Sequence, residues 1–339
     1  MRVVCLAGGV GGAKLADGQQ RALDPGELSV VVNTGDDLER HSLPIWPDHD
    51  TVLYTLAGAA DPVQGWGLAD ESWAVMDQLA RLGEETWFRL GDRDIATHLF
   101  RATRLRAGRR PTEVAAELAR ALGVSSRVLP MADEPVRTRV RTDGGWLDFQ
   151  DYFVRLRQEP AVKEIAFEGA ERAQVTPEVA FAFETAEAVL IAPSNPIVSI
   201  GPILAVPGMV AAVSAARARG IRVVAVSGIV AGKALRGPAD RMMTSLGEEA
   251  TALGVARRYA ATGLLDAFVL DEQDRPVYAF SILLNGVKTP ATAKGLQKVA
   301  LGQMVTAQDI ANMALVLCSP LGRNIAGQPL SVCGHVYAI

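Results

Sequence analysis

The chain has 339 residues, of which 49% are hydrophobic and 21% charged, with a formal net charge of −4 at pH 7. This composition is typical of a globular protein with enough core for one large or two medium domains. It lacks the clustered positive charge that non-specific nucleic-acid binding requires, and it contains no signal-type segment or apolar run of about 18 residues. We therefore expect a cytoplasmic protein with no nucleic-acid or membrane partner. Its three cysteines should be reduced: Cys5, Cys318 and Cys333.

Short apolar runs predict buried parallel strands at 2–7, 28–33, 187–192, 221–227 and 265–270. Both faces of each run are apolar, and helix-length segments separate several of them. The fold class is therefore α/β, with a doubly wound, Rossmann-like parallel sheet. Such a sheet binds ligands at the carboxyl ends of its strands, where the strand order reverses.

Two segments depart from this pattern. Residues 50–125 favour helix at 51–60, 72–82, 94–106 and 111–122, which predicts a helical insertion, and residues 137–168 predict a small β-rich excursion with a hairpin. Within the insertion, the basic stretch 101–110 is interpreted as a solvated helix face, the alternative being a lip that attracts an anionic substrate. His98 is interpreted as a helix-surface histidine and Asp50 as the N-cap of a helix that starts at Thr51.

The first predicted strand runs into a glycine-rich turn, Gly8-Gly9-Val10-Gly11-Gly12, followed by Ala13-Lys14. Glycines let the backbone approach an anion, and the N–H groups of the following helix point at it, so the turn predicts a phosphate site. The spacing fits neither G-x-G-x-x-G nor G-x-x-x-x-G-K-[ST]. The alternative is a turn that only packs a strand on a helix.

Further polar loops follow the other predicted strands. Asn33-Thr34-Gly35-Asp36-Asp37 places two acids at a strand end, which suits Mg²⁺, although an Asx-type turn also explains it. Residues 87–94 alternate charges behind two aromatic rings, as expected of either a surface ion-pair network or a site for a flat polar ring. Residues 193–196 and 227–233 are predicted to form turns. Their backbone N–H groups either bind phosphates or only close the turns.

Seven stretches in order resemble the 2-phospho-L-lactate transferase family (CofD-like): 8–15, 31–37, 47–58, 90–99, 129–138, 149–154 and 193–204. The resemblance covers residues 1 to about 275, which we expect to form the transferase domain. It implies transfer of a phosphorylated three-carbon acid from a guanosine diphosphate-activated donor to the deazaflavin Fo. GMP is released, Mg²⁺ is the cofactor, and the product belongs to coenzyme F-420 biosynthesis.

The same resemblance implies roles for particular residues. It implies that Asp50 and Arg89 contact Fo, and we expect Trp87 to help form the wall of that pocket. Asp37 and Asp50 are our own candidates for the catalytic and Mg²⁺-binding residues. The candidate contacts of the guanosine diphosphate donor are Gly9, Gly11, Gly12, Lys14, Asn33, Ser194, Asn195, Pro196, Gly232, Arg236 and Gly237. Gly228 and Ala231 depart from the family's pattern, and a methyl group at Ala231 is expected to narrow the approach to a phosphate.

Residues 276–339 form an atypical tail that resembles the end of a short-chain dehydrogenase, without that family's Tyr-x-x-x-Lys. We expect a helix at 306–318 and a strand at 330–333 that adds an edge to the sheet or contacts a second subunit in a homodimer, the alternative being an appendage without fixed contacts. Two other functions stay open. One is an inactive deazaflavin- or GDP-binding protein, and the weaker one is an NAD(P)-dependent dehydrogenase.

Overall fold

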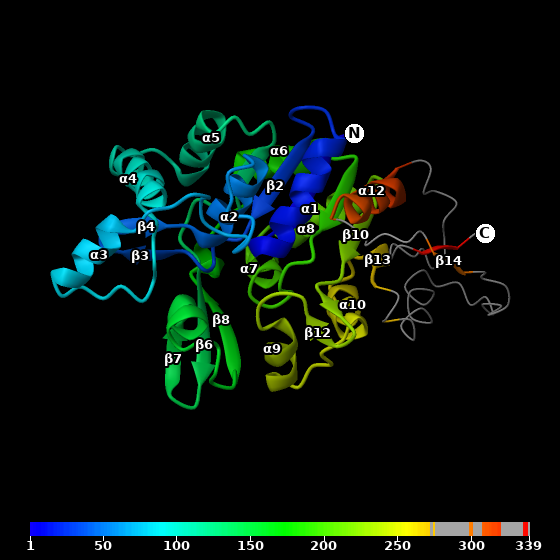
Figure 1. The fold of residues 1–339 in the computed structure, drawn as a ribbon. Helices are drawn as coiled ribbons and strands as arrows, with labels where there is room; N and C mark the ends of the chain where they lie inside the picture. Colours follow the sequence, from blue (N-terminus) through cyan, green and yellow to red (C-terminus); the bar gives the residue numbers. More distant parts are fainter. Residues whose placement is uncertain (272–273, 275–297, 301–306, 320–334, 338–339) are drawn as a thin grey trace.

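The computed structural model of the protein describes residues 1–271, 274, 298–300, 307–319 and 335–337 (Figure 1). Its centre is a six-stranded, all-parallel sheet in the order β13-β10-β9-β1-β2-β5. The strands are β1 (Val3–Ala7), β2 (Leu28–Val32), β5 (Arg127–Pro130), β9 (Ala188–Ile191), β10 (Val223–Val226) and β13 (Ala267–Val269). The order reverses between β1 and β9, which confirms the doubly wound, Rossmann-like class.

Alternate residues of each strand face opposite sides of the sheet, and both sides are covered. Cys5 and Val30 face α1 (Gly9–Ala22), α2 (Pro47–Leu56) and α5 (Pro111–Ala121). Leu6 and Val31 face the other core. That core contains α6 (Pro177–Thr185), α7 (Ile200–Ala205), α8 (Met209–Ala218), α9 (Ala239–Ser245) and α10 (Ala252–Ala260). Burial on both faces is why the strands are continuous apolar runs in the sequence.

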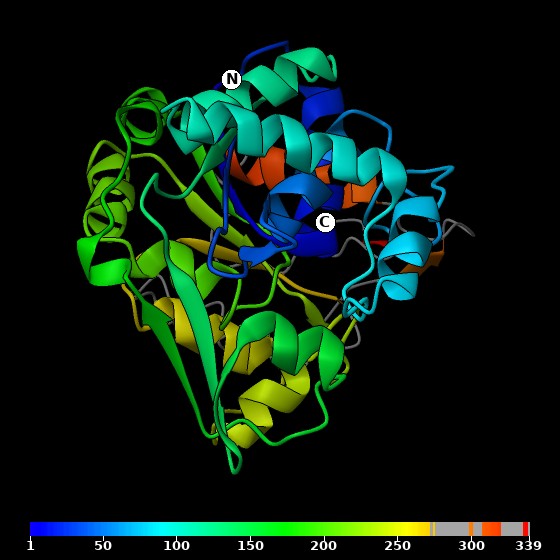
Figure 2. The same cartoon turned by 90° about the vertical axis from the view of Figure 1, so that its left-hand side faces the viewer.

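Two excursions flank the sheet. The first consists of a hairpin, β3 (Leu38–Arg40) with β4 (Leu43–Ile45), and the helices α3 (Ala74–Arg81) and α4 (Asp92–Arg106). The second is a three-stranded antiparallel sheet, β7-β6-β8, where the sequence predicted only a hairpin. Its strands are β6 (Arg137–Thr142), β7 (Gly145–Asp148) and β8 (Glu164–Glu168), with a π-helical turn, η1 (Asp151–Arg155), after β7. In Figure 1 this small sheet projects beside α9, and Figure 2 shows it below α4 and α5.

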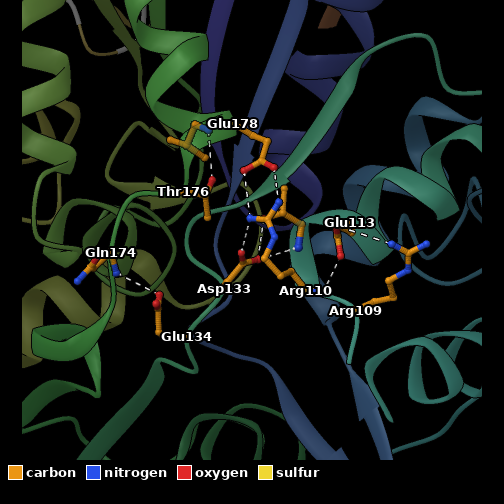
Figure 3. Close-up of polar contacts among 10 residues, drawn as sticks. Arg109, Arg110, Glu113, Asp133, Glu134, Gln174, Thr176 and Glu178 are labelled. Carbon is orange, nitrogen blue, oxygen red and sulfur yellow. Dashed lines mark hydrogen bonds and ion pairs between the residues drawn. The ribbon is translucent and has the colours of Figure 1, made fainter. Parts of the chain in front are cut away.

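The basic stretch 101–110 is not a uniformly solvated face, because Arg101 is fully buried. At the other end of the stretch, Arg110 bonds to Asp133 at 3.0 Å and also to Glu178, and thereby ties α5 to the loop after β5 and to α6 (Figure 3). The acidic partners of Arg110 show that this guanidinium is engaged in holding elements together.

Part of the C-terminal tail packs on the central sheet. Helix α12 (Ala307–Cys318) lies against α1 and contacts β9 and β10, and Gln308 Nε2 donates to the Gly18 carbonyl at 2.8 Å. Ala311 and Ala314 are fully buried there. The expected strand at 330–333 and Cys333 lie outside the described residues. Where the tail is described, β14 (Lys298–Ala300) and β15 (His335–Tyr337) pair with each other and not with the central sheet.

Among the helices that the structure describes, none has both the length and the apolar character needed to cross a membrane. The two cysteines in the described ranges, Cys5 and Cys318, are free and buried, and burial raises the pKa of each thiol to about 12.

Candidate active site

The loops that follow β1 and β9 meet where the strand order reverses. Ser194 joins them: its Oγ accepts from the Gly8 N–H at 3.0 Å and donates to the Gly8 carbonyl at 2.8 Å. Asn33 begins the loop after β2 and continues the ladder, with its N–H donating to the Ala7 carbonyl at 3.1 Å. Three of the loops that the sequence placed at one edge of the sheet are therefore in direct contact.

The glycines of the first turn are required by close packing. A Cβ on Gly11 would lie 2.4 Å from the Pro193 carbonyl oxygen, and a Cβ on Gly12 would lie 2.6 Å from Ser194 Oγ. Gly9 has a φ of +61°, a conformation that side chains disfavour. The packing alternative thus accounts for Gly11 and Gly12, whether or not a phosphate also lies near the turn.

Asp48, the second residue of α2, places its carboxylate at the N-terminus of α1. A Cβ on Gly8 would lie 2.3 Å from Asp48 Oδ2, the Gly9 N–H donates to the carboxylate, and Asn33 Nδ2 donates to Oδ2 at 2.9 Å. A carboxylate at a helix N-terminus is stabilised by the helix dipole. Burial nevertheless dominates and raises the pKa of Asp48 to about 6, and the pKa of the hydrogen-bonded neighbour Asp36 lies well above its ordinary range for the same reason.

Asp37 and Asp50 are both buried, and each has one carboxylate oxygen without a hydrogen-bond partner: Asp37 Oδ1 and Asp50 Oδ2. Burial raises the pKa of Asp37 well above its usual range. Arg137 and Arg101 oppose that shift, while the charge of Asp50 adds to it. Buried carboxylate oxygens without partners are rare and need an explanation. Hard divalent cations take carboxylate oxygens, so each of these two residues has the chemistry of a Mg²⁺ ligand.

Asp50 lies inside α2, which begins at Pro47 after Trp46, so the prediction that Asp50 caps the helix is wrong. Its Oδ1 pairs with the Arg101 guanidinium and lies 3.6 Å from His49 Nδ1. Burial alone would raise the pKa of Asp50, but Arg101 and then His49 outweigh it and hold the pKa at about 2. The carboxylate is therefore ionised throughout the neutral range.

The candidate acceptor residues lie on the segment before α4. Arg89 is exposed and stacks its guanidinium 4.2 Å from the centre of the Trp73 ring. Trp87 instead packs edge-on against Phe88, with ring centres 5.9 Å apart, and carries Arg40 over its face at 4.9 Å. Arg89 and Trp87 are thus neighbours in sequence that contact different aromatic partners. Trp73 was not singled out in the sequence.

The remaining residues proposed to contact the guanosine diphosphate donor lie in several different environments. Asn195 Oδ1 accepts from the Ile197 and Val198 N–H groups at 2.9 and 3.2 Å, which closes its turn, and Pro196 is buried. Arg236 is exposed and donates to the Gln64 carbonyl at 2.7 Å. Lys14 is exposed on α1, and Gly237 has a φ of +71°.

Ala231 and Gly232 form the tip of a two-residue hairpin between β11 (Ile229–Val230) and β12 (Lys233–Ala234). Both have positive φ, +49° and +75°, as a type I′ turn requires. The Ala231 N–H donates to Asp274 Oδ1 at 3.1 Å. Ala231 therefore adopts a strained, left-handed backbone conformation in this turn, and its N–H group is already hydrogen-bonded to Asp274.

Sequence reasoning missed a buried polar group on α4. His98, interpreted as a surface residue, is fully buried, and Arg101 is the largest fully buried side chain in the described chain. Tyr54 donates to Asp94 Oδ1 at 2.6 Å, and Asp94 Oδ2 lies 3.4 Å from His98 Nε2. The spacing of Asp94, His98 and Arg101 places them on one helix face beside buried Ile95 and Ala102, which was the available signal.

These features define the chain as a doubly wound α/β protein with buried carboxylates in the loops and helix that follow its second strand. The family model described as "2-phospho-L-lactate transferase CofD" matches residues 3–297, and the chain belongs to this family of transferases.

Two relatives show the range of names within the family. A phosphoenolpyruvate transferase of Mycobacterium ulcerans is 43% identical over 296 residues, covering 81% of this chain and 89% of its own. A 2-phospho-L-lactate transferase of Methanosarcina mazei is 40% identical over 273 residues, covering 80% and 88%. The crystal structure of a UPF0052 family protein from Bacillus halodurans has a TM-score of 0.52 at 17% identity, covering 93% and 98%, and supports the fold alone.

The family match extends beyond the boundary that the sequence suggested, from about 275 to 297. The likeness of residues 276–339 to a short-chain dehydrogenase has no support in these matches. The dehydrogenase alternative thereby loses the argument that rested on the tail.

Proposed function

We propose that the protein transfers a phosphorylated three-carbon acid from a guanosine diphosphate-activated donor to Fo, releasing GMP, in coenzyme F-420 biosynthesis. Family membership supports the transferase class, and the names of the relatives supply the candidate three-carbon units, phosphoenolpyruvyl and 2-phospholactyl. The observation that carries the proposal is that Asp37 and Asp50 each have a buried carboxylate oxygen without a hydrogen-bond partner.

In this mechanism a ribityl hydroxyl of Fo attacks the phosphorus that bears the three-carbon acid. The P–O bond to the GMP phosphate breaks, the hydroxyl proton is released, and a phosphodiester forms. Mg²⁺ held by Asp37 and Asp50 would neutralise the diphosphate and the departing GMP. Because its pKa of about 2 is far below neutral, Asp50 suits a ligand role and is a poor proton acceptor.

The decisive experiment incubates the purified protein with Fo, Mg²⁺ and each of three donors, carrying the phosphoenolpyruvyl, 2-phospholactyl or phosphoglyceryl unit. GMP and the phosphodiester are quantified by chromatography. Asp37→Asn and Asp50→Asn should each lower turnover on the order of 10²-fold, because a charged ligand of the reacting phosphates is lost. Asp143→Asn, an exposed carboxylate in the β6–β7 turn, is the matched control. Binding of Fo or donor without product from any of the three would instead establish an inactive binding protein.

The acceptor site has its own test. We propose that Arg89 contacts Fo, with Trp87 and the Arg89–Trp73 stack forming apolar surface for its flat ring. Arg89→Ala should weaken Fo binding more than GDP binding in calorimetric titrations, whereas Arg81→Ala, an exposed arginine at the end of α3, should change neither. Equal losses for both ligands in Arg89→Ala would show that Arg89 maintains the fold or binds the donor.

A further inference from the structure

Arg101 is fully buried, although it belongs to the most basic stretch of the chain. Its guanidinium pairs with Asp50, donates to the Pro44 carbonyl at 3.0 Å and lies 4.2 Å from the centre of the Trp46 ring. These contacts come from α2, from β4 and from the residue before α2. Arg101 is therefore fixed by contacts from several directions.

The contact with His98 assigns a proton. Arg101 Nη1 lies 2.9 Å from His98 Nδ1, and because a guanidinium only donates, Nδ1 must be the acceptor. A neutral His98 then carries its hydrogen on Nε2, which faces Asp94 Oδ2 at 3.4 Å. The Asp94 carboxylate in turn accepts from the Tyr54 hydroxyl. Tyr54, Asp94 and His98 thus form a chain of polar groups that ends at Arg101.

This assignment argues against a metal ion among Asp50, Asp94 and His98, although single ligand atoms of the three residues lie within 4.8 Å of one another. Binding through Nε2 would require both ring nitrogens of His98 to lack hydrogen while Nδ1 accepts from Arg101. Binding through Nδ1 would require Arg101 to leave. The Arg101 guanidinium also places a positive charge beside the Asp50 carboxylate, so that no metal ion is needed there to balance its charge.

We propose that Arg101 is a positioning residue for Asp50: by binding Oδ1, it fixes the orientation of the carboxylate that the proposed function assigns to the Fo site. Oδ1 is engaged by Arg101, whereas Oδ2 has no hydrogen-bond partner and lies 3.8 Å from His98 Nδ1. Because contacts with Asp50, Pro44 and Trp46 fix Arg101, it restricts the Asp50 carboxylate to one orientation, as a ligand-binding group requires. The inference rests on the proposed function, because it assigns Asp50 to the Fo site.

The test is a double-mutant cycle between Arg101→Lys and Asp50→Asn, read out as Fo affinity by calorimetry in the presence of Mg²⁺. Lysine keeps the charge but loses the planar, multiply bonded geometry. In the wild-type background, Arg101→Lys should weaken Fo binding about tenfold and leave GDP affinity within twofold. In the Asp50→Asn background, the same change should alter Fo affinity less than twofold, because Arg101 acts through Asp50.

Arg217→Lys is the matched control. Arg217 makes an equivalent pair with Asp266, with Nε 3.0 and 3.1 Å from its two oxygens, between α8 and the segment before β13. It should leave Fo affinity unchanged. If Arg101→Lys does not fold, Trp46→Phe replaces it, since it keeps the Arg101–Asp50 pair and reduces only the stacking surface. Its smaller loss of Fo affinity should likewise vanish beside Asp50→Asn.

The outcomes separate the two proposals. If Asp50→Asn weakens Fo binding but Arg101→Lys does so equally in both backgrounds, or weakens GDP binding as much, Arg101 only maintains the fold and the inference is overturned. If Asp50→Asn binds Fo as the wild type does, or the wild type binds none, the assignment of Asp50 to the Fo site fails first, and the role of Arg101 fails with it.

Discussion

Replacing Asp48 by asparagine should make the protein more stable at neutral pH. Asp48 belongs to α2, its carboxylate is buried against the N-terminus of α1, and its pKa of about 6 stands against an ordinary value of 3.8. A carboxyl group with a raised pKa in the folded state stabilises the protein when protonated, and this contribution is lost as the pH rises from the unfolded to the folded pKa. The difference of roughly 2 units corresponds to about 3 kcal/mol, because one unit is worth about 1.4 kcal/mol.

Asparagine carries no charge but keeps an oxygen that accepts from the Asn33 amide and the Gly9 N–H. We therefore compare the free energies of unfolding of Asp48→Asn and the wild type at each pH. The advantage of the variant should grow by about 2 kcal/mol between pH 4 and pH 7.5, which is most of the roughly 3 kcal/mol given by the pKa difference. Urea denaturation at several pH values measures this difference, with Asp143→Asn as the exposed control. A gap that stays constant with pH, or that shrinks as pH rises, would refute the electrostatic reasoning.

Three further changes test packing and backbone strain. Gly12→Ala should destabilise the protein by about 1–3 kcal/mol, because its Cβ would lie 2.6 Å from a serine oxygen, whereas Gly144→Ala, whose nearest atom is 3.6 Å away, should change little in the same urea titrations. Ala231→Gly should stabilise by about 0.5 kcal/mol, as the relief of left-handed strain exceeds the added flexibility of the unfolded chain; a net loss would show that the turn is unstrained. Leu317→Ala should cost about 2–3 kcal/mol, since this side chain of α12 is 7% exposed, and Val316→Ala, at 37% exposed, much less. Equal effects at these two positions would show that α12 does not pack on the sheet in solution.

Much of the fold was predictable because its strands are buried on both faces. Val223–Val226 is an uninterrupted apolar run, and no other local structure explains it as well. Strand β5 was missed because it starts with Arg127 and ends with Pro130, and at the edge of the sheet only its middle needs to be apolar. Its position there is set by pairing with β2, which the segment itself does not specify.

The site was predictable only where chemistry coincides with a strand end. Asp37 is singled out in this way; it is buried in the structure, and its ligand role stays a prediction. Helix α2, which contains Asp50, begins at Pro47 and not at the predicted Thr51. Proline at the first helical position is a stronger start signal here than the capping ability of aspartate. The burial of Arg101 was not predictable, because the charge of a residue does not reveal whether a distant segment supplies an oppositely charged partner, here Asp50.

The packing of α12 on α1 has a consequence for synthesis of the chain. Helix α1 ends at residue 22 and α12 begins at residue 307, so 284 residues lie between two helices that pack against each other. At about 5–20 residues per second, the ribosome needs roughly 15–60 s to make the second after the first. During that interval the apolar surface that Ala311 and Ala314 will cover is open in the nascent chain, so this face of the sheet is where premature association has to be prevented.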